Sequence, residues 1–443
     1  MKKYILISLL TFKTFYSWSQ AFPAGDYDLI PSCSDEFNSS STVNWSKLLY
    51  RYYSFSTDPK NIFYLENNVQ SGQNSSIEPS TKVCKITSNT YPSTQAWFDP
   101  WNNTNQYANY NSGTLWHNQY FKYGYYEVRA KIPANNVAIC SAFWLWNNID
   151  NNYNEIDIFE NNSGVNFHNY WSFSLHHGTS DEIFEYNAEY SPIKVINPCD
   201  ERHPLNETNY NFGTSFHTFG MEWQPNYINF YLDGSFFKQF TMLVKHDGSN
   251  TQIPVNNMNI KMNVVLFAKV GCDLRLDPPP NGEAFEIDYF HYYKRKPVLT
   301  NASYNASNNS ITMTVNTDNS EDSYYWQTLT PNVSFNWISN NTAQIALSTA
   351  YPNGVSVNVS ATGSNPAATS TSTFTFSQIS GNLCNISAQS NVYVAPSITA
   401  PQSGCSSVMV YSGTNVTFIA PNSITLNPGF EVQIGGTFNG LTQ

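Results

Sequence analysis

The sequence has few charged residues, and those it has are more often acidic than basic. Lys, Arg, Asp and Glu make up only 12% of its 443 residues, and the formal net charge is −11. A protein of that charge repels the phosphate groups of nucleic acids and of anionic membranes, so we expect neither as a partner. An anionic polysaccharide is disfavoured by the overall charge but not excluded, because a local group of basic residues can still bind one.

Long apolar runs are also missing. No stretch reaches the roughly 18 consecutive apolar residues that a membrane span needs. The first 19 residues instead contain two lysines at the start, Lys2 and Lys3, then a short apolar stretch and a small-x-small ending at Ser17-Trp18-Ser19. This pattern predicts a signal peptide (residues 1–19) that is cleaved near Gln20. We therefore expect a secreted protein that is extracellular or associated with the cell surface.

Cysteines are few and scattered. There are seven, an odd number, and none are spaced as a CxxC pair, so we expect no zinc site. Export permits disulfides, and Cys384 and Cys405 are close enough in sequence to form one within the C-terminal part. At least one other thiol must stay unpaired or couple elsewhere.

Helical periodicity is absent, whereas aromatic residues are abundant. Phe, Trp and Tyr make up 16% of the chain, and Tyr and Trp readily stack on flat faces such as sugar rings. Residues 20–296 alternate between short strand-like segments and Asn, Gly or Pro turns, which favours a β-sandwich. Asp233-Gly234, for example, predicts a tight turn between the strands Tyr227–Leu232 and Ser235–Phe240.

The composition changes after Lys294-Arg295-Lys296-Pro297. Residues 297–388 are rich in Ser, Thr and Asn, and we expect them to form an Ig-like β-sandwich with Trp326 and Trp337 as core anchors. Residues 389–443 contain closely spaced short strands, which predict a small C-terminal β module. A chain of this length exceeds one core, which agrees with several domains.

Three carboxylates lie within the run Asn154-Glu155-Ile156-Asp157-Ile158-Phe159-Glu160-Asn161. On a regular strand Glu155 and Asp157 point to one face and Glu160 to the other. One extra residue, a β-bulge between Asp157 and Glu160, would bring all three to one face. Acids that share a face repel one another and lose solvation, so they need a reason to be there. Cleavage of a glycosidic bond with retention provides one: a carboxylate nucleophile and a carboxylic acid about 5–5.5 Å apart.

The chain also contains a control for this pattern. Glu286-Ile287-Asp288 repeats Glu-x-Asp, but His291 stands where the third acid would fall. The pair alone is therefore a weak signal, and an ordinary strand with solvent-facing acids is the alternative interpretation. The run Phe143-Trp144-Leu145-Trp146, just before the acids, places aromatic surface beside them and favours a site.

Several other blocks lie in order around the acidic run. They are Ser34–Phe37, Tyr123–Pro133, Ala142–Leu145, Ser174–Gly178, Phe216–Trp223, Tyr231–Gly234 and Ile287–Phe290. With the acids, they resemble glycoside hydrolase family 16, the group of laminarinases, lichenases, agarases and κ-carrageenases. The resemblance implies an all-β fold: a concanavalin-like β-jelly-roll sandwich as the catalytic domain, at residues 20–296. The span from Glu155 to Glu160 resembles the bulged form of laminarinases, agarases and carrageenases; lichenases have one residue fewer.

The same resemblance implies catalytic roles. Glu155 is the expected nucleophile, and Glu160 is the expected general acid and then base. Asp157 lies between them and would share a proton or a hydrogen bond with Glu155. Departures from the family pattern at Asn154 and His177 bear on the substrate, not on this machinery.

Further residues are candidates for substrate or metal binding. Trp144, Trp116 and His176 are candidate substrate-binding residues, with a core tryptophan and a structural histidine as the alternatives. Asp288 is a candidate ligand of a structural Ca²⁺ on the convex face, as the resemblance implies. We expect no cofactor to be required.

These features together predict a secreted retaining endo-glycosidase that hydrolyses a β-linked polysaccharide. β-1,3-Glucan, mixed-linkage glucan, and agar- or carrageenan-type galactan all fit. A non-catalytic carbohydrate-binding protein and a transglycosylase on the same fold are the alternatives, and residues 297–443 could instead serve adhesion or surface anchoring. We expect a monomer.

Overall fold

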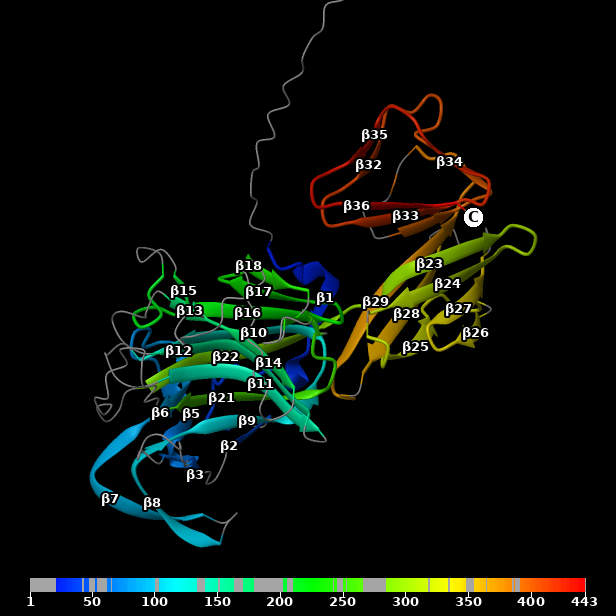
Figure 1. Cartoon of the computed structure of the whole chain (residues 1–443). Helices are drawn as coiled ribbons and strands as arrows, with labels where there is room; N and C mark the ends of the chain where they lie inside the picture. Colours follow the sequence, from blue (N-terminus) through cyan, green and yellow to red (C-terminus); the bar gives the residue numbers. More distant parts are fainter. Residues whose placement is uncertain are drawn as a thin grey trace, which may run out of the picture.

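The computed structural model is built almost entirely of β-strands, as the sequence predicts (Figure 1). Its described part contains short 3-10 helices at η1 (Ala24–Asp26), η2 (Pro31–Cys33) and η3 (Glu66–Asn68). None of the helices in this part is long and apolar enough to cross a membrane. The expected signal peptide lies outside the described residues. These are 21–41, 44–47, 52–53, 62–64, 66–99, 103–133, 140–149, 152–162, 170–178, 202–204, 210–241, 243–244, 250–251, 253–265, 284–317, 319–333, 335–347, 354–363, 365–384, 386 and 391–442.

Two large antiparallel sheets form an N-terminal sandwich. The back sheet has the order β18 (Ser235–Phe240), β17 (Tyr227–Leu232), β16 (His217–Gln224), β10 (Gly124–Lys131), β22 (Ala284–Arg295), β6 (Lys82–Thr87) and β5 (Val69–Asn74), and β1 (Tyr27–Leu29) also pairs with β22. The front sheet has the order β14 (Ser174–Gly178), β12 (Asn152–Asn162), β11 (Cys140–Ile149), β21 (Met258–Val265), β9 (Thr114–Phe121) and β2 (Trp45–Lys47).

Alternate residues of both sheets meet in one apolar core. Phe143 and Leu145 of β11 and Val128 of β10 are fully buried in this core. Because successive side chains of a strand point to opposite faces, the residues between them face outward. The predicted hairpin of β17 and β18 is confirmed with the expected bounds, and its turn residues Asp233 and Gly234 have φ of 49° and 75°.

Smaller sheets flank the sandwich. A four-stranded sheet has the order β3 (Tyr52–Tyr53), β4 (Ile62–Tyr64), β8 (Thr104–Ser112) and β7 (Asn89–Asp99), and the β7–β8 hairpin projects from the body (Figure 1). The other pairs are β13 (Tyr170–Ser172) with β15 (Arg202–Pro204), and β19 (Leu243–Val244) with β20 (Asn250–Thr251). The consecutive strands β13 and β14 therefore lie in different sheets.

A second, C-terminal sandwich begins directly after β22. One of its sheets has the order β23 (Val298–Asn305), β24 (Ser310–Asn316), β27 (Thr342–Ala346) and β26 (Phe335–Ser339); the other begins with β25 (Ser323–Thr328), β28 (Val355–Thr362) and β29 (Thr369–Gln378). Trp326 is a core residue, only 3% exposed, as predicted. The same prediction for Trp337 is wrong, because this side chain is 56% exposed on the edge strand β26.

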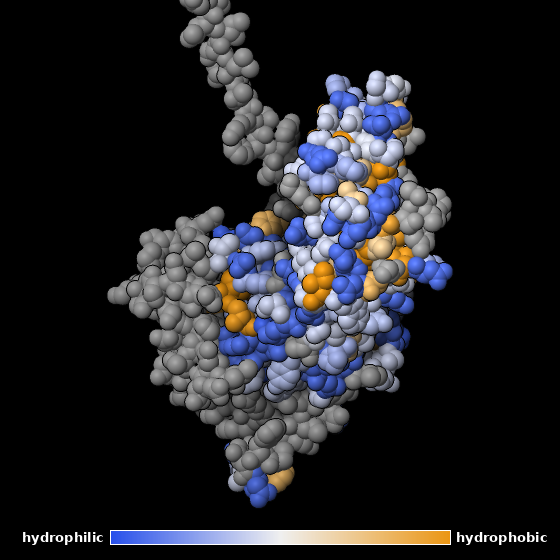
Figure 2. Space-filling view, turned by 90° about the vertical axis from the view of Figure 1, so that its right-hand side faces the viewer, coloured by the Kyte–Doolittle hydropathy of each residue, from blue (hydrophilic) through white to orange (hydrophobic). Residues whose placement is uncertain are grey.

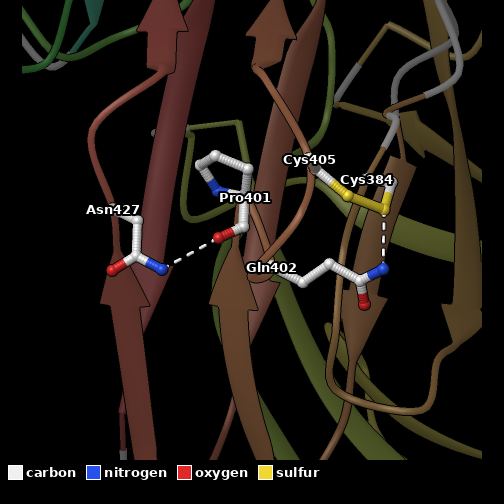
Figure 3. The surroundings of a disulfide bond; sticks show 5 residues. All are labelled: Cys384, Pro401, Gln402, Cys405 and Asn427. Atoms are coloured by element: carbon white, nitrogen blue, oxygen red, sulfur yellow. Dashed lines mark hydrogen bonds between the residues drawn. A yellow bond between two sulfur atoms is a disulfide. The ribbon is translucent and has the colours of Figure 1, made fainter.

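The chain ends in a stack of parallel strands. β30 (Asn391–Val394), β33 (Asn415–Ile419) and β36 (Thr437–Leu441) continue the sheet of β29, so the sheet crosses the predicted division at 388/389. Two further parallel pairs complete the stack: β31 (Ser397–Ala400) with β34 (Ser423–Leu426), and β32 (Val408–Val410) with β35 (Phe430–Val432). The disulfide Cys384–Cys405, which the sequence allowed, closes the start of this stack, and Gln402 donates a hydrogen bond to its Cys384 sulfur (Figure 3).

The two sandwiches lie against each other with a junction of only Lys296 and Pro297 between β22 and β23. Ala368, in the loop before β29, is part of the buried core of the N-terminal sandwich. The backbone N–H of Thr371 donates to Asp28 Oδ2 at 2.8 Å. The composition change in the sequence therefore marks a boundary between domains but not a flexible linker.

Candidate active site

The predicted bulge lies in β12, opposite β11. The cross-strand register pairs Phe143 with Phe159 and Trp144 with Asp157, so Ile158 has no partner of its own. On the two sides of this shift, Glu155 pairs with Trp146 and Glu160 pairs with Ala142. Ala142, Trp144 and Trp146 alternate along β11 and share its outward face. Paired residues share a face of the sheet, so the acids Glu155, Asp157 and Glu160 lie in three successive rows of the outer face of the front sheet.

The bulge is held by contacts on the core side. Ile158 and Phe159 are both fully buried. The indole Nε1–H of Trp171 donates to the carbonyl oxygen of Ile158 at 3.0 Å, which satisfies a backbone group that the bulge takes out of the ladder. The position of Glu160 on the outer face therefore depends on packing from β13, the next strand along the chain.

The three acids differ in exposure. Glu155 and Glu160 are partly exposed, whereas Asp157 between them is buried. Asn154 and Asn161 at the two ends of the run are buried as well. The outer pair is thus open to a ligand lying along the sheet, and the inner carboxylate is shielded between them.

Tryptophan side chains extend the site across the neighbouring strands. Trp144 lies in the Asp157 row, and Lys261 of β21 and then Trp116 of β9 follow in that row. The Nζ atom of Lys261 lies 4.3 Å from the ring centroids of Trp116 and Trp144 and 4.0 Å from that of Trp146. A buried ammonium surrounded by three indole rings is a strong cation–π arrangement. The rings form one aromatic surface beside the acids.

The sequence motifs do not identify several members of this surface. Trp146 was recognised only as a neighbour of Trp144, and both in fact face outward. The signal for β21 was present in its polar residues at every second position, Asn259, Lys261 and Asn263, within an apolar strand. All three are buried, and Asn263 Oδ1 accepts a hydrogen bond from Trp144 Nε1 at 2.7 Å.

His176 lies on β14, where its backbone pairs with Glu155, and Ser174 pairs with Asp157. The side chain of His176 lies outside the described part of the structure. Its role as a substrate-binding residue stays a prediction.

The second Glu-x-Asp pattern, Glu286-Ile287-Asp288, lies on the back sheet, where its acids have hydrogen-bond and charged partners. Glu286 and Asp288 are on β22 of the back sheet. Glu286 accepts hydrogen bonds from Ser75 Oγ and Ser76 N and pairs with Lys85 at 3.4 Å. Burial alone would raise the pKa of Glu286, but these serine hydrogen bonds and the charge of Lys131 outweigh it and hold the pKa below its usual value. Glu286 is therefore a structural carboxylate.

The carboxylate of Asp288 takes part in an ion pair. Its Oδ2 accepts a hydrogen bond from Arg129 Nη1 at 2.6 Å, and Arg129 also pairs with Glu78. One oxygen of Asp288 is thus paired with a guanidinium, and its role as a Ca²⁺ ligand stays a prediction. In the described part of the chain, no group of three or more His, Cys, Asp or Glu residues is arranged to hold a metal ion.

Comparisons with known proteins cover the segment that contains this site. Residues 66–269 match the model of the family "Glycosyl hydrolases family 16". A "Beta-glucanase" of Acetivibrio thermocellus is 32% identical over 189 residues, which are 42% of this chain and 46% of that protein. A "Beta-glucanase" of Bacillus subtilis is 29% identical over 148 residues, 33% of this chain and 48% of that protein. The chain spans about half the length of the curated relatives it matches.

Solved structures also resemble the chain at low identity. The laminarinase catalytic domain from Thermotoga maritima is 18% identical, with a TM-score of 0.40, and the match covers 61% of this chain and 98% of that one. The κ-carrageenase from Pseudoalteromonas carrageenovora is 19% identical, with a TM-score of 0.41, over 60% of this chain and 94% of that one. The acids of β12 and the tryptophan surface lie inside residues 66–269, the segment that matches the family model.

Proposed function

We propose that this chain is a secreted, retaining endo-glycosidase that hydrolyses β-1,3-glucan. The observation that carries the proposal is the bulge at Ile158, which puts Glu155, Asp157 and Glu160 on one face, beside an aromatic surface. The match of this segment to family 16 and the relatives named "Beta-glucanase" support it. Secretion is proposed from the signal-peptide pattern of residues 1–19.

The chemistry follows a double displacement. The Glu155 carboxylate attacks the anomeric carbon, the glycosidic C–O bond breaks, and Glu160 gives its proton to the leaving oxygen. A water molecule then attacks the same carbon, Glu160 takes its proton, and the bond to Glu155 breaks, which restores the carboxylate. Asp157 lies between the two, so its negative charge favours the protonated form of a neighbouring acid.

The substrate class rests on two observations that point the same way. The matched relatives carry the name "Beta-glucanase", which favours a β-glucan. The bulged acidic run resembles laminarinases, agarases and carrageenases rather than lichenases, which favours β-1,3 over mixed linkage. The net charge of −11 disfavours a sulfated galactan.

The test is to incubate the full chain with laminarin, lichenan, agarose and κ-carrageenan and to size the products. We expect a ladder of oligosaccharides from laminarin, with the newly formed reducing end first released as the β-anomer in NMR spectra. Glu155→Gln and Glu160→Gln should each lower the rate by about 10²–10⁴-fold or more. The matched control is Glu431→Gln, the same change at an exposed carboxylate of β35.

Three outcomes would contradict the proposal in different ways. Initial release of the α-anomer would mean inversion and a different role for Glu155. Products longer than the substrate after addition of oligosaccharide acceptors would indicate a transglycosylase. Binding without cleavage of any of the four polymers would favour the carbohydrate-binding alternative.

A further inference from the structure

Two large aromatic side chains meet at one edge of the C-terminal sandwich and are exposed there. Tyr325 lies on β25 and Trp337 on β26, the edge strands of the two sheets. They are 59% and 56% exposed, and their ring centroids lie 6.1 Å apart at an interplanar angle of 87°. Leu329 and Ile338 are also exposed close to them in sequence. These four residues are called the aromatic edge below.

The aromatic edge is connected to the hydrophobic core by an intervening aromatic ring. Phe335, half-buried on β26, lies 6.4 Å from the Trp337 ring and 6.3 Å from the core residue Trp326. The cross-strand register shifts between Trp337 and Ser339, which marks an irregularity in β26 at this point. The exposed rings therefore rest on the hydrophobic core through an intermediate ring, so their positions are defined.

A group of polar side chains begins beside Tyr325. Across the sheet, Tyr325 pairs with Ser360, and Ser360 pairs with Thr371. Hydrogen bonds join the side chains of Ser360 and Thr371 at 2.9 Å and of Thr373 and Asn358 at 2.7 Å. These hydroxyl and amide groups can both donate and accept further hydrogen bonds. Together they form an uncharged ladder on the outer face of β28 and β29.

Charge is almost absent from this C-terminal part of the chain. Residues 298–443 contain no Lys, Arg or His and only four acids, Asp318, Glu321, Asp322 and Glu431. Glu321 and Asp322 pair with Lys122 and Lys294 of the N-terminal sandwich. Figure 2, which looks at the side where β26 and β27 lie in Figure 1, shows apolar residues exposed among polar ones on this sandwich.

We propose that the aromatic edge and the polar ladder beside it form a binding site for a neutral polysaccharide, the β-glucan of the proposed function. Sugar rings present apolar faces that stack on Trp and Tyr, and their hydroxyls match an uncharged ladder of hydroxyl and amide groups. The lack of basic residues disfavours a phosphate- or sulfate-bearing polymer. The site holds the chain on its polymer at a place separate from the acids of β12. The identity of the polymer rests on the proposed function; the position of the site does not.

The test measures retention of the full chain on insoluble β-1,3-glucan particles. The Glu155→Gln variant serves as the background, so that cleavage does not release the protein. Adding Tyr325→Ala and Trp337→Ala should weaken retention by about tenfold or more, the equivalent of about 1.4 kcal/mol. The same variants in the active chain should leave the hydrolysis of short soluble oligosaccharides unchanged, because neither residue touches the acids.

Matched variants separate loss of the rings from loss of the fold. Tyr325→Phe with Trp337→Phe keeps two rings and should keep most of the retention. Tyr411→Ala removes another exposed aromatic of the C-terminal part and should change nothing. The unfolding midpoints of all variants show whether the sandwich is intact.

The two proposals fail separately. Equal retention of the background chain and its double alanine variant, or no retention of either, would overturn the binding site whatever the activity. Hydrolysis of soluble laminarin by the unmodified chain is measured independently and decides the proposed function. If retention depends on Tyr325 and Trp337 but laminarin is not cleaved, the binding site holds and the enzyme proposal falls.

Discussion

Asp322→Asn should destabilise the contact between the two sandwiches, because it breaks a buried ion pair. Lys294 Nζ at the end of β22 lies 2.9 Å from both Asp322 oxygens, and the two side chains are only 7% and 0% exposed. Asn319 Nδ2 and Thr317 Oγ1 also donate to this carboxylate. The substitution preserves the shape of the side chain and removes only its charge, which leaves the ammonium buried against an amide.

The size of the effect follows from burial. Removing one partner of a buried ion pair costs about 3–5 kcal/mol, because the other charge stays desolvated without compensation. We expect about 3 kcal/mol for Asp322→Asn, since the amide oxygen can still accept a hydrogen bond from Lys294. Adding Lys294→Met removes the second charge as well, so the double variant should be less destabilised than the sum of the two single variants.

The assay is urea-induced unfolding followed by tryptophan fluorescence and far-UV circular dichroism. The four proteins of the cycle are compared with Glu321→Gln, which breaks the Lys122–Glu321 pair. Glu321 is 45% exposed, so this control should lose at most about 1 kcal/mol. An unchanged Asp322→Asn variant, or a double variant as unstable as the sum of the singles, would refute the reasoning.

Two other groups give separate predictions. Burial lowers the pKa of His117 to about 4, and the neutral ring is hydrogen-bonded to the carbonyl oxygen of Cys33 and to the backbone N–H of Gln119. As the pH falls from about 6.5 to about 4, the unfolded chain therefore takes up a proton that the folded chain does not. About 3 kcal/mol of the free energy of unfolding is lost in that range. His117→Gln should flatten the dependence of the unfolding free energy on pH there, and an equal slope would contradict the assignment. Lys261→Met removes the ammonium among three indoles and should raise KM for the polymer about fivefold with less effect on kcat, from about 1 kcal/mol of lost cation–π energy. Unchanged KM and tryptophan emission would show that the rings are held without it.

The alternation of side chains between the two faces of a strand was enough to predict that a bulge brings the three acids to one face. Glu155, Asp157 and Glu160 cannot share a face without an inserted residue, and the register of β11 with β12 contains that residue at Ile158. The predicted hairpin is confirmed for the same kind of reason, because Asp233-Gly234 adopts the positive φ values that a tight turn needs. Both are local properties that alternation and turn chemistry determine.

Burial of a single aromatic residue was not predictable in the same way. Trp326 and Trp337 both lie in edge strands, β25 and β26, yet the first is in the core and the second is 56% exposed. Whether a ring on such a strand is covered depends on the packing of distant segments, and alternation contains no information about it. The role of Lys261 was not predictable for the same reason, because its three tryptophan contacts come from β9 and β11, which are distant from it in sequence.

The contrast between the two Glu-x-Asp patterns shows what distinguishes a site from a structural strand. On β22, Glu286 and Asp288 each have a cationic partner, Lys85 and Arg129, and those partners account for their presence. On β12, the cross-strand partners of the acids on β11 are Ala142, Trp144 and Trp146, part of an aromatic surface with the Lys261 ammonium among its indoles. Three acids that share one face beside an aromatic surface are arranged for a ligand and not for a structural ion pair. The third acid matters because only a bulge can bring it to the same face as the other two.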